Sequence, residues 1–185
     1  TTITPCQKEY LLAFHKPAGI VCTTSKIDKN NVIDYLNFPE RIYPVGRLDK
    51  ESTGLLLLTN NGQLMDDVLR GSNYHEKEYI VHVNKPITDS VLQAMAQGVP
   101  ILDTITRPCK IRRMGKDCFY ITLTQGLNRQ IRRMCEYFDY RVTSLKRIRI
   151  MNIELGSLPV GKWRELTPSE IKTLKNLAQN KGEAE

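Results

Sequence analysis

The sequence reads Gly46-Arg47-Leu48-Asp49-Lys50-Glu51-Ser52-Thr53-Gly54 and continues at once as Leu55-Leu56-Leu57-Leu58-Thr59. Four consecutive leucines before Asn60-Asn61-Gly62 predict a fully buried strand that ends in a turn. The charged loop is therefore expected at the edge of a core strand, which presents Asp49 from a rigid base. Asp49 has two interpretations at this point, a catalytic carboxylate or a turn aspartate that bonds its own backbone.

The positive charge of the chain is concentrated in one segment. The net charge is +7 over 185 residues, whereas residues 107–149 hold 12 Lys/Arg against 3 Asp/Glu, a local balance of +9. A basic segment beside a nearly neutral remainder indicates a surface that binds the phosphate backbone of nucleic acid, and its alternative is a solvated basic face. With 41% hydrophobic residues, the chain suffices for one large domain or two small lobes that share a cleft.

Cysteines and histidines give no pattern of a metal site. The five cysteines include no C-x-x-C pair, and the three histidines complete no zinc-ligand spacing. We therefore expect free thiols, no metal and a reducing, cytoplasmic location. No stretch approaches the roughly 20 apolar residues that span a bilayer, and the N-terminal residues do not resemble a signal sequence, so neither membrane insertion nor export is expected.

Hydrophobic periodicity predicts more strands than helices, and the two kinds rarely alternate. This order favours an α+β fold with a mixed, largely antiparallel sheet over a doubly wound parallel one. Strands are expected at residues 10–15, 20–24, 55–59, 76–83, 109–114, 118–125 and 141–150. Helices are expected at residues 32–38, 62–70 with Gly71 at its end, 88–98 and 128–138, and after the capping box Thr167-Pro168-Ser169-Glu170.

Two further segments bear on function. Asn128 is expected as the N-cap of the helix over residues 128–138, which places three arginines near its first turns, namely Arg129, Arg132 and Arg133. Gly156–Lys162 has the glycine and lysine spacing of a phosphate-binding loop, but Trp163 stands where Ser or Thr would hold magnesium. We therefore interpret this second segment as a turn.

Three motifs in a fixed order resemble the RsuA family of pseudouridine synthases. They are Gly46–Asp49 with Ser52–Leu56, then Lys77-Glu78-Tyr79, then Gly126–Met134, and residues 15–19 and 149–152 extend the resemblance over nearly the whole chain. Within the family, the sequence is most similar to the RluF type, which acts on 23S ribosomal RNA. The resemblance implies a catalytic domain over residues 1–185, with flanking helices and two lobes around a central cleft, divided near residues 60–75. The family's N-terminal S4 domain is absent here, so it was removed or substrate selection rests on this domain.

The resemblance also implies a reaction and a set of catalytic residues. Pseudouridine formation breaks the N1–C1′ bond, turns the uracil and joins C5 to C1′, which requires no cofactor. Asp49 is then the carboxylate beside C1′, as stabiliser, nucleophile or base at C2′. The family places Arg132 in an ion pair with Asp49, and it places Tyr79 against the uracil with the hydroxyl near C5. Leu123 is expected in the core or, by resemblance, beside the uracil.

The implied partner is ribosomal RNA, a 23S stem-loop in the first place, with transfer RNA as an open alternative. We expect a monomer whose phosphate contacts include seven basic residues, namely Arg47, Arg112, Arg113, Arg129, Arg133, Lys146 and Arg147. Arg47 could also occupy the space that a flipped uridine leaves. Two other functions are alternatives. One is a non-catalytic RNA-binding or ribosome-assembly protein, and the other is a base-flipping hydrolase or deaminase, which the lack of a zinc-ligand set disfavours.

Overall fold

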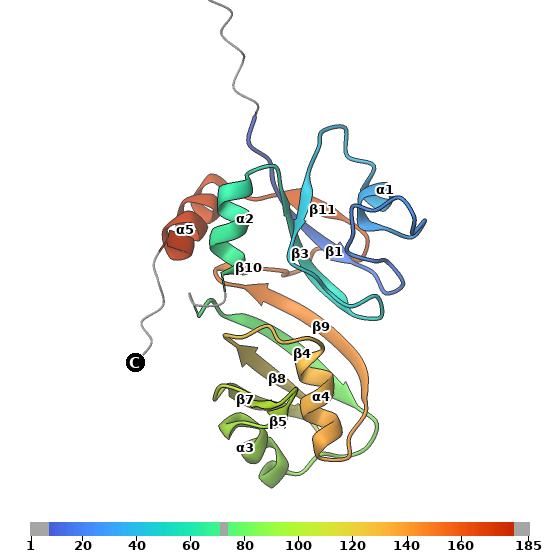
Figure 1. Cartoon of the computed structure of the whole chain (residues 1–185), viewed down its shortest axis with the longest axis vertical. Helices are drawn as coiled ribbons and strands as arrows, with labels where there is room; N and C mark the ends of the chain where they lie inside the picture. The colour runs from blue at the N-terminus through green and yellow to red at the C-terminus, as the bar shows by residue number, and fades with distance from the viewer. Residues whose placement is uncertain (1–7, 71–73, 180–185) are drawn as a thin grey trace, which may run out of the picture.

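The leucine strand lies at the centre of the fold. The structure is a computed structural model, and it describes residues 8–70 and 74–179 (Figure 1). Strand β3, Thr53–Thr59, is buried on both faces, because Leu55 and Leu57 belong to one core cluster and Leu56 and Leu58 to another. The predicted buried strand is thus confirmed. Gly71 and the two ends of the chain fall outside the described residues, so the helix end predicted there stays a prediction.

One nine-stranded sheet holds most of the described strands together. Its order is β11-β1-β3-β9-β4-β8-β7, with β2 also paired to β3 and β10 to β9. The strands around β3 are β1 (Leu11–Lys16), β2 (Tyr43–Val45) and β11 (Trp163–Glu165). The other half contains β4 (Lys77–Val83), β7 (Lys110–Gly115), β8 (Cys118–Leu123), β9 (Val142–Ile150) and β10 (Ile153–Glu154). A separate two-stranded sheet pairs β5 (Pro100–Ile101) with β6 (Thr104–Ile105).

A short parallel pairing joins the two halves of this sheet. Strand β3 pairs with β9 through only two residue pairs, Thr53 with Lys146 and Gly54 with Arg147, and the other pairings in the sheet are antiparallel. The sheet is therefore mixed and mostly antiparallel, as the sequence predicts. The predicted division into two lobes near residues 60–75 stays a prediction.

Five described helices cover the sheet. Figure 1 shows α1 (Val32–Leu36), α2 (Gly62–Leu69) and α5 (Pro168–Gln179) around β1 and β3, and α3 (Asp89–Gln97) and α4 (Gln130–Tyr137) beside β4, β7 and β8. The capping box of α5 forms as predicted: the Thr167 backbone N–H donates to Glu170 Oε1 at 2.9 Å, and the Glu170 backbone N–H donates to Thr167 Oγ1 at 3.1 Å. This reciprocal bonding satisfies two donors that a helix start otherwise leaves unpaired.

Two local predictions are wrong. Residues 20–24 do not form a strand, because only Val21 makes an isolated bridge, to Asn31. Asn128 is not the N-cap of α4, because the helix begins at Gln130 and the cap position is Arg129, in the left-handed region at φ 49°. The Gln130 side chain instead accepts from the Leu127 backbone N–H at 3.1 Å. At the start of α4, this contact between residues three apart takes the place of the expected asparagine cap.

Gly54 allows the two halves of the sheet to meet. Its φ is +109°, and an added Cβ would overlap the Arg147 backbone, lying 2.5 Å from the Arg147 nitrogen. We expect Gly54→Ala to lower the free energy of unfolding by about 2 to 4 kcal/mol, from backbone strain and overlap together. Gly62→Ala is the matched control, because nothing lies within 4 Å of its added Cβ at the start of α2. Equal urea midpoints for the two variants would show that the junction tolerates a side chain.

Candidate active site

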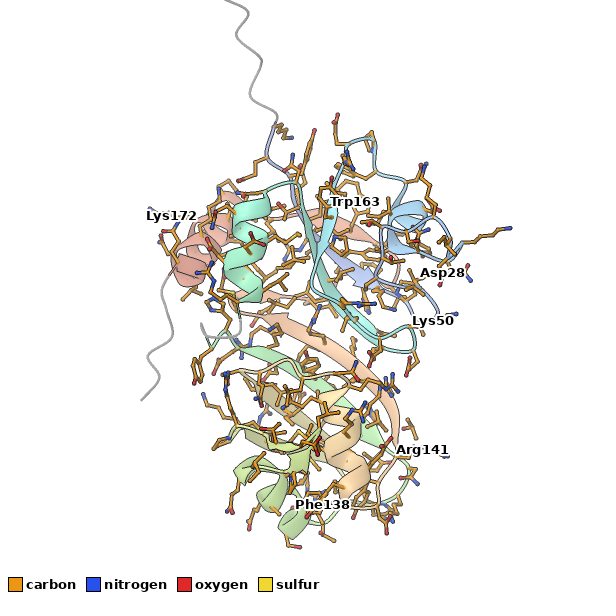
Figure 2. The ribbon with its side chains drawn as sticks, viewed as in Figure 1. Asp28, Lys50, Phe138, Arg141, Trp163 and Lys172 are labelled. Carbon is orange, nitrogen blue, oxygen red and sulfur yellow. The ribbon has the colours of Figure 1, made fainter. Side chains whose placement is uncertain are left out.

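A buried lysine holds the loop between β2 and β3 through hydrogen bonds to backbone carbonyls. Lys16 is fully buried, and its ammonium donates to the carbonyls of Pro17 at 2.8 Å and Lys50 at 3.2 Å. The Lys50 carbonyl also accepts from the Gly19 backbone N–H, and Ser52 N–H closes the turn by donating to the Asp49 carbonyl at 2.9 Å. Lys50 is labelled in Figure 2 and marks this loop. These bonds hold Asp49 in one position at the start of β3.

The predicted ion pair between Asp49 and Arg132 is present. Arg132 Nε lies 3.3 Å from Asp49 Oδ2, and Arg132 Nη2 donates to Ser52 Oγ at 2.7 Å. The Arg132 side chain is only 11% exposed, whereas Asp49 remains 32% exposed. Arg132 reaches across from α4, and it therefore fixes the carboxylate while leaving it accessible from the pocket. A nearby guanidinium favours the ionised form of a carboxylic acid.

Arg129 and Glu51 extend this cluster of charges. Arg129 Nη1 lies 3.5 Å from Asp49 Oδ2 and 2.7 Å from Glu51 Oε1, and Arg132 Nε lies 3.7 Å from the same Glu51 oxygen. The pKa of Glu51 is lowered by a hydrogen bond that its own backbone N–H donates to the carboxylate and then by the Arg129 contact, against the effect of burial. Arg129, whose backbone is left-handed at the cap position of α4, therefore contributes its side chain to the site.

A pocket of about 370 Å³ opens beside Asp49. Its wall includes Tyr79 from β4 and Leu123 from β8, which is 3% exposed, and Arg47 lies exposed at its edge. Tyr79 is half-buried and packs against the core of this half of the molecule. The structure therefore places the three predicted catalytic residues, Asp49, Tyr79 and Arg132, together with Leu123 and Arg47 around one cavity.

Two more cations line the pocket. Arg147 is 3% exposed, and its Nε donates to the Leu55 carbonyl at 2.8 Å, whereas Nη2 is buried without a hydrogen-bond partner in residues 8–70 and 74–179. Lys77 lies on β4, where burial and then the neighbouring charge of Arg147 lower its pKa to about 8. Neither group forms an ion pair with a carboxylate within the described parts of the chain. Lys77 is the first residue of the motif Lys77-Glu78-Tyr79, but the sequence alone does not indicate its role.

The predicted RNA-binding residues do not share one surface. The paired residues Arg147, Tyr79, Ile121 and Ile111 form one row across β9, β4, β8 and β7, on the face that contributes to the pocket. The next row is Lys146, Ile80, Tyr120 and Arg112. Adjacent residues of a strand point to opposite faces, so Lys146 and Arg112 lie away from the pocket.

Three other predicted RNA-binding arginines have partners inside the protein. Arg113 donates to Asp89 Oδ1 at 2.8 Å and to the Ile87 carbonyl at 2.6 Å, which ties β7 to the start of α3. Arg133 donates to the carbonyl and side chain of Asn128, both at 2.9 Å, and Arg129 belongs to the Asp49 cluster. Their phosphate contacts stay predictions, and Arg47 and Arg129 are the two members of the set that are exposed and line the pocket.

Sequence reasoning overlooked four residues of the site, namely Lys16, Glu51, Ser52 and Lys77. All four lie within motifs that the sequence analysis quoted, but a motif does not say which of its residues are buried. Their roles come from contacts between residues far apart in the sequence, such as Ser52 with Arg132.

Comparison with known proteins identifies this architecture. A family model described as RNA pseudouridylate synthase matches residues 10–137. The chain belongs to the RNA pseudouridylate synthase family. A solved pseudouridylate synthase superposes with a TM-score of 0.83 at 30% identity, covering 90% of this chain and 74% of that one. The α+β fold with a mixed, largely antiparallel sheet, which the order of strands and helices in the sequence predicts, is thereby confirmed.

Relatives within the family include two named enzymes. The dual-specificity RNA pseudouridine synthase RluF of Salmonella typhi is 53% identical over 169 residues, which make up 91% of this chain and 58% of that protein. The ribosomal large subunit pseudouridine synthase B of Bacillus subtilis is 34% identical, over 90% of this chain and 71% of that protein. The predicted resemblance to the RsuA family and its RluF type is confirmed. The chain spans somewhat less than three fifths of the RluF relative's length.

The described residues can also be compared with the sequence predictions about metals, thiols and membranes. In residues 8–70 and 74–179, no group of three or more His, Cys, Asp and Glu residues is placed to hold a metal ion. The four described cysteines are free, and burial raises the pKa of Cys109 to about 11 and of Cys135 to about 12. No helix in the described part of the chain has the length and hydropathy of a membrane span.

An unpaired cation in the pocket wall should weaken the fold. The lowered pKa means that protonated Lys77 costs on the order of 1 to 3 kcal/mol at pH 7, so Lys77→Met should raise the free energy of unfolding. The unfolded chain binds the proton more tightly, so this cost is full below pH 8 and disappears as the pH rises toward 10.5. Urea unfolding at pH 7 and pH 9.5 measures the gain, with Lys172→Met on α5 as the exposed control (Figure 2). A variant less stable than the parent at pH 7 would contradict the expectation.

Proposed function

We propose that this chain isomerises uridine to pseudouridine in ribosomal RNA, with a 23S stem-loop as the substrate. The observation that carries the proposal is an accessible carboxylate, Asp49, held by Arg132 at the edge of a pocket that also contains Tyr79. Membership of the pseudouridylate synthase family and the relatives named for this activity support it. The alternative of a non-catalytic RNA-binding protein gives no reason for this arrangement, and we do not favour it.

Asp49 is the group we assign to the sugar. Arg132 and Arg129 both approach Oδ2, and Oδ1 forms no bond or ion pair within the described residues. One oxygen is thus anchored while the other remains available to C1′ or to the C2′ proton. Held in place by the two arginines, the carboxylate can counter the positive charge that develops on the sugar as the glycosidic bond breaks.

Tyr79 and Leu123 are the groups we assign to the base. A uridine in the pocket must leave its stack, which costs a few kcal/mol, and an aromatic ring recovers part of this by stacking. The half-buried ring of Tyr79 offers one face for stacking, and the buried side chain of Leu123 closes the apolar side. In this assignment the Tyr79 hydroxyl helps to remove the C5 proton after C5 has joined C1′.

The first test replaces the proposed catalytic carboxylate. Asp49→Asn should lower turnover by about 10²- to 10⁴-fold, because a neutral amide neither removes a proton nor counters a developing cation. RNA affinity should stay nearly unchanged. Turnover is measured as tritium released from 23S RNA that carries [5-³H]uridine. Asp103→Asn is the control, since Asp103 is exposed in the β5–β6 turn at φ 59°, a conformation that Asn also accepts. Turnover of Asp49→Asn within tenfold of the parent would refute the assignment.

The second test asks which face of the sheet meets RNA. Each phosphate contact that is lost should reduce the slope of log affinity against log salt by about 0.7 to 0.9. We expect Arg47→Gln, at the pocket edge, to reduce the slope by this amount. We expect Arg112→Gln, on the opposite face and stacked 4.1 Å from the Tyr120 ring centroid, to leave it unchanged. Filter binding at roughly 50 to 300 mM potassium chloride gives both slopes. A reduced slope for Arg112→Gln with an unchanged slope for Arg47→Gln would place RNA on the face of the sheet opposite the pocket.

A further inference from the structure

The pocket holds two cations whose charge nothing in the described structure neutralises. Arg147 Nη2 is buried without a partner, and the ammonium of Lys77 forms no hydrogen bond or ion pair with the described residues. The pocket lining contains one carboxylate, Asp49, and Arg132 and Arg129 already bind it. The two arginines that bind Asp49 are thus distinct from these two cations, which lie on β4 and β9.

An unneutralised pair of like charges in a pocket wall is an unfavourable arrangement. Burial and the charge of Arg147 both disfavour the charged form of Lys77, and Arg147 Nη2 is buried without a hydrogen bond to the described residues. A fold retains such a pair at a cost, and a negative charge brought by a ligand would remove that cost. The pair lies next to the residue that we assign to the base. Lys77 and Tyr79 are two residues apart on one face of β4, and both line the pocket. The missing negative charge is therefore expected on the base that stacks on Tyr79.

The proposed reaction generates a negative charge at this place. When the N1–C1′ bond breaks, its electron pair leaves with uracil, whose negative charge spreads over N1, O2, O4 and C5. Asp49 either bonds C1′ or accepts the C2′ proton. The base then turns and C5 supplies a pair to form the new bond to C1′, while the Asp49–C1′ bond breaks or Asp49 returns the proton to C2′. C5 then loses its proton and N1 gains one. Atoms and electrons balance, and no other reactant enters.

We propose, on the basis of the proposed function, that Lys77 and Arg147 bind the oxygens of the uracil and stabilise the anion formed on cleavage. Both side chains carry only hydrogen-bond donors. They match the two carbonyl oxygens of uracil, and they would meet a donor at the amino group of cytosine. Lysine and arginine held in a pocket need no reorganisation as the charge develops, which makes such donors more effective than water. The pair therefore accelerates cleavage and selects uracil over cytosine.

The test compares two leaving groups. Fluorine at C5 withdraws electrons and stabilises the uracil anion, so 5-fluorouridine depends less on the protein for this stabilisation. Single-turnover consumption of the target nucleoside is measured in 23S RNA transcripts made with uridine or with 5-fluorouridine. Lys77→Met should slow consumption of uridine by about 10²- to 10³-fold, as removal of one such donor does elsewhere. The loss on 5-fluorouridine should be at least about tenfold smaller, by the same principle.

Two variants separate this role from a structural one. Lys77→Arg keeps the cation and should retain the parent's rate on both substrates to within about tenfold, whereas Lys172→Met on α5 should change neither rate. Equal losses on both substrates in Lys77→Met, or no loss, would overturn the inference. Equal losses with weaker RNA binding would assign Lys77 to a backbone phosphate instead. If the parent consumes neither nucleoside, the proposed function fails, and the inference fails with it.

Discussion

The close approach of Gly54 to the Arg147 backbone is the constraint on which the rest of the molecule depends. Only two residue pairs join β3 to β9, and a side chain at Gly54 would separate them. The same junction places the Asp49 loop, at the start of β3, within reach of Arg132 on α4. The contact that makes one sheet out of two halves therefore also assembles the charged cluster, and stability and site geometry are linked at this position.

Electrostatics divides the site into two parts. Asp49 and Glu51 are paired with Arg129 and Arg132, which orients both carboxylates. Lys77 and Arg147, which also line the pocket, have no such match among residues 8–70 and 74–179. A protein optimised for stability alone would neutralise or remove these two cations. Their retention in a pocket wall is typical of a site whose ligand brings the missing charge.

The basic segment shows how charge in the sequence can mislead about charge in space. Residues 107–149 carry a local balance of +9, which favoured a single RNA-binding face. The strands of this segment alternate their side chains between two faces, so Arg147 enters the pocket while Lys146 and Arg112 lie on the other side. Several of the remaining arginines bind backbone carbonyls or carboxylates.

The sequence by itself determined the buried leucine strand, the capped α5 helix, the mixed sheet and, through its three motifs, the family and the central residues of the site. These features rest on local chemistry or on side chains that the reaction requires. The tertiary structure alone decided which residues support them: the cap of α4, the missing strand at residues 20–24, the buried Lys16 beneath the loop, and the unpaired Lys77 and Arg147. Except for the cap of α4, where Gln130 accepts from the Leu127 N–H three residues away, these features depend on burial and on contacts between different segments of the chain. Periodicity and motif spacing contain no information about which distant residue will supply a partner, or will leave one unpaired.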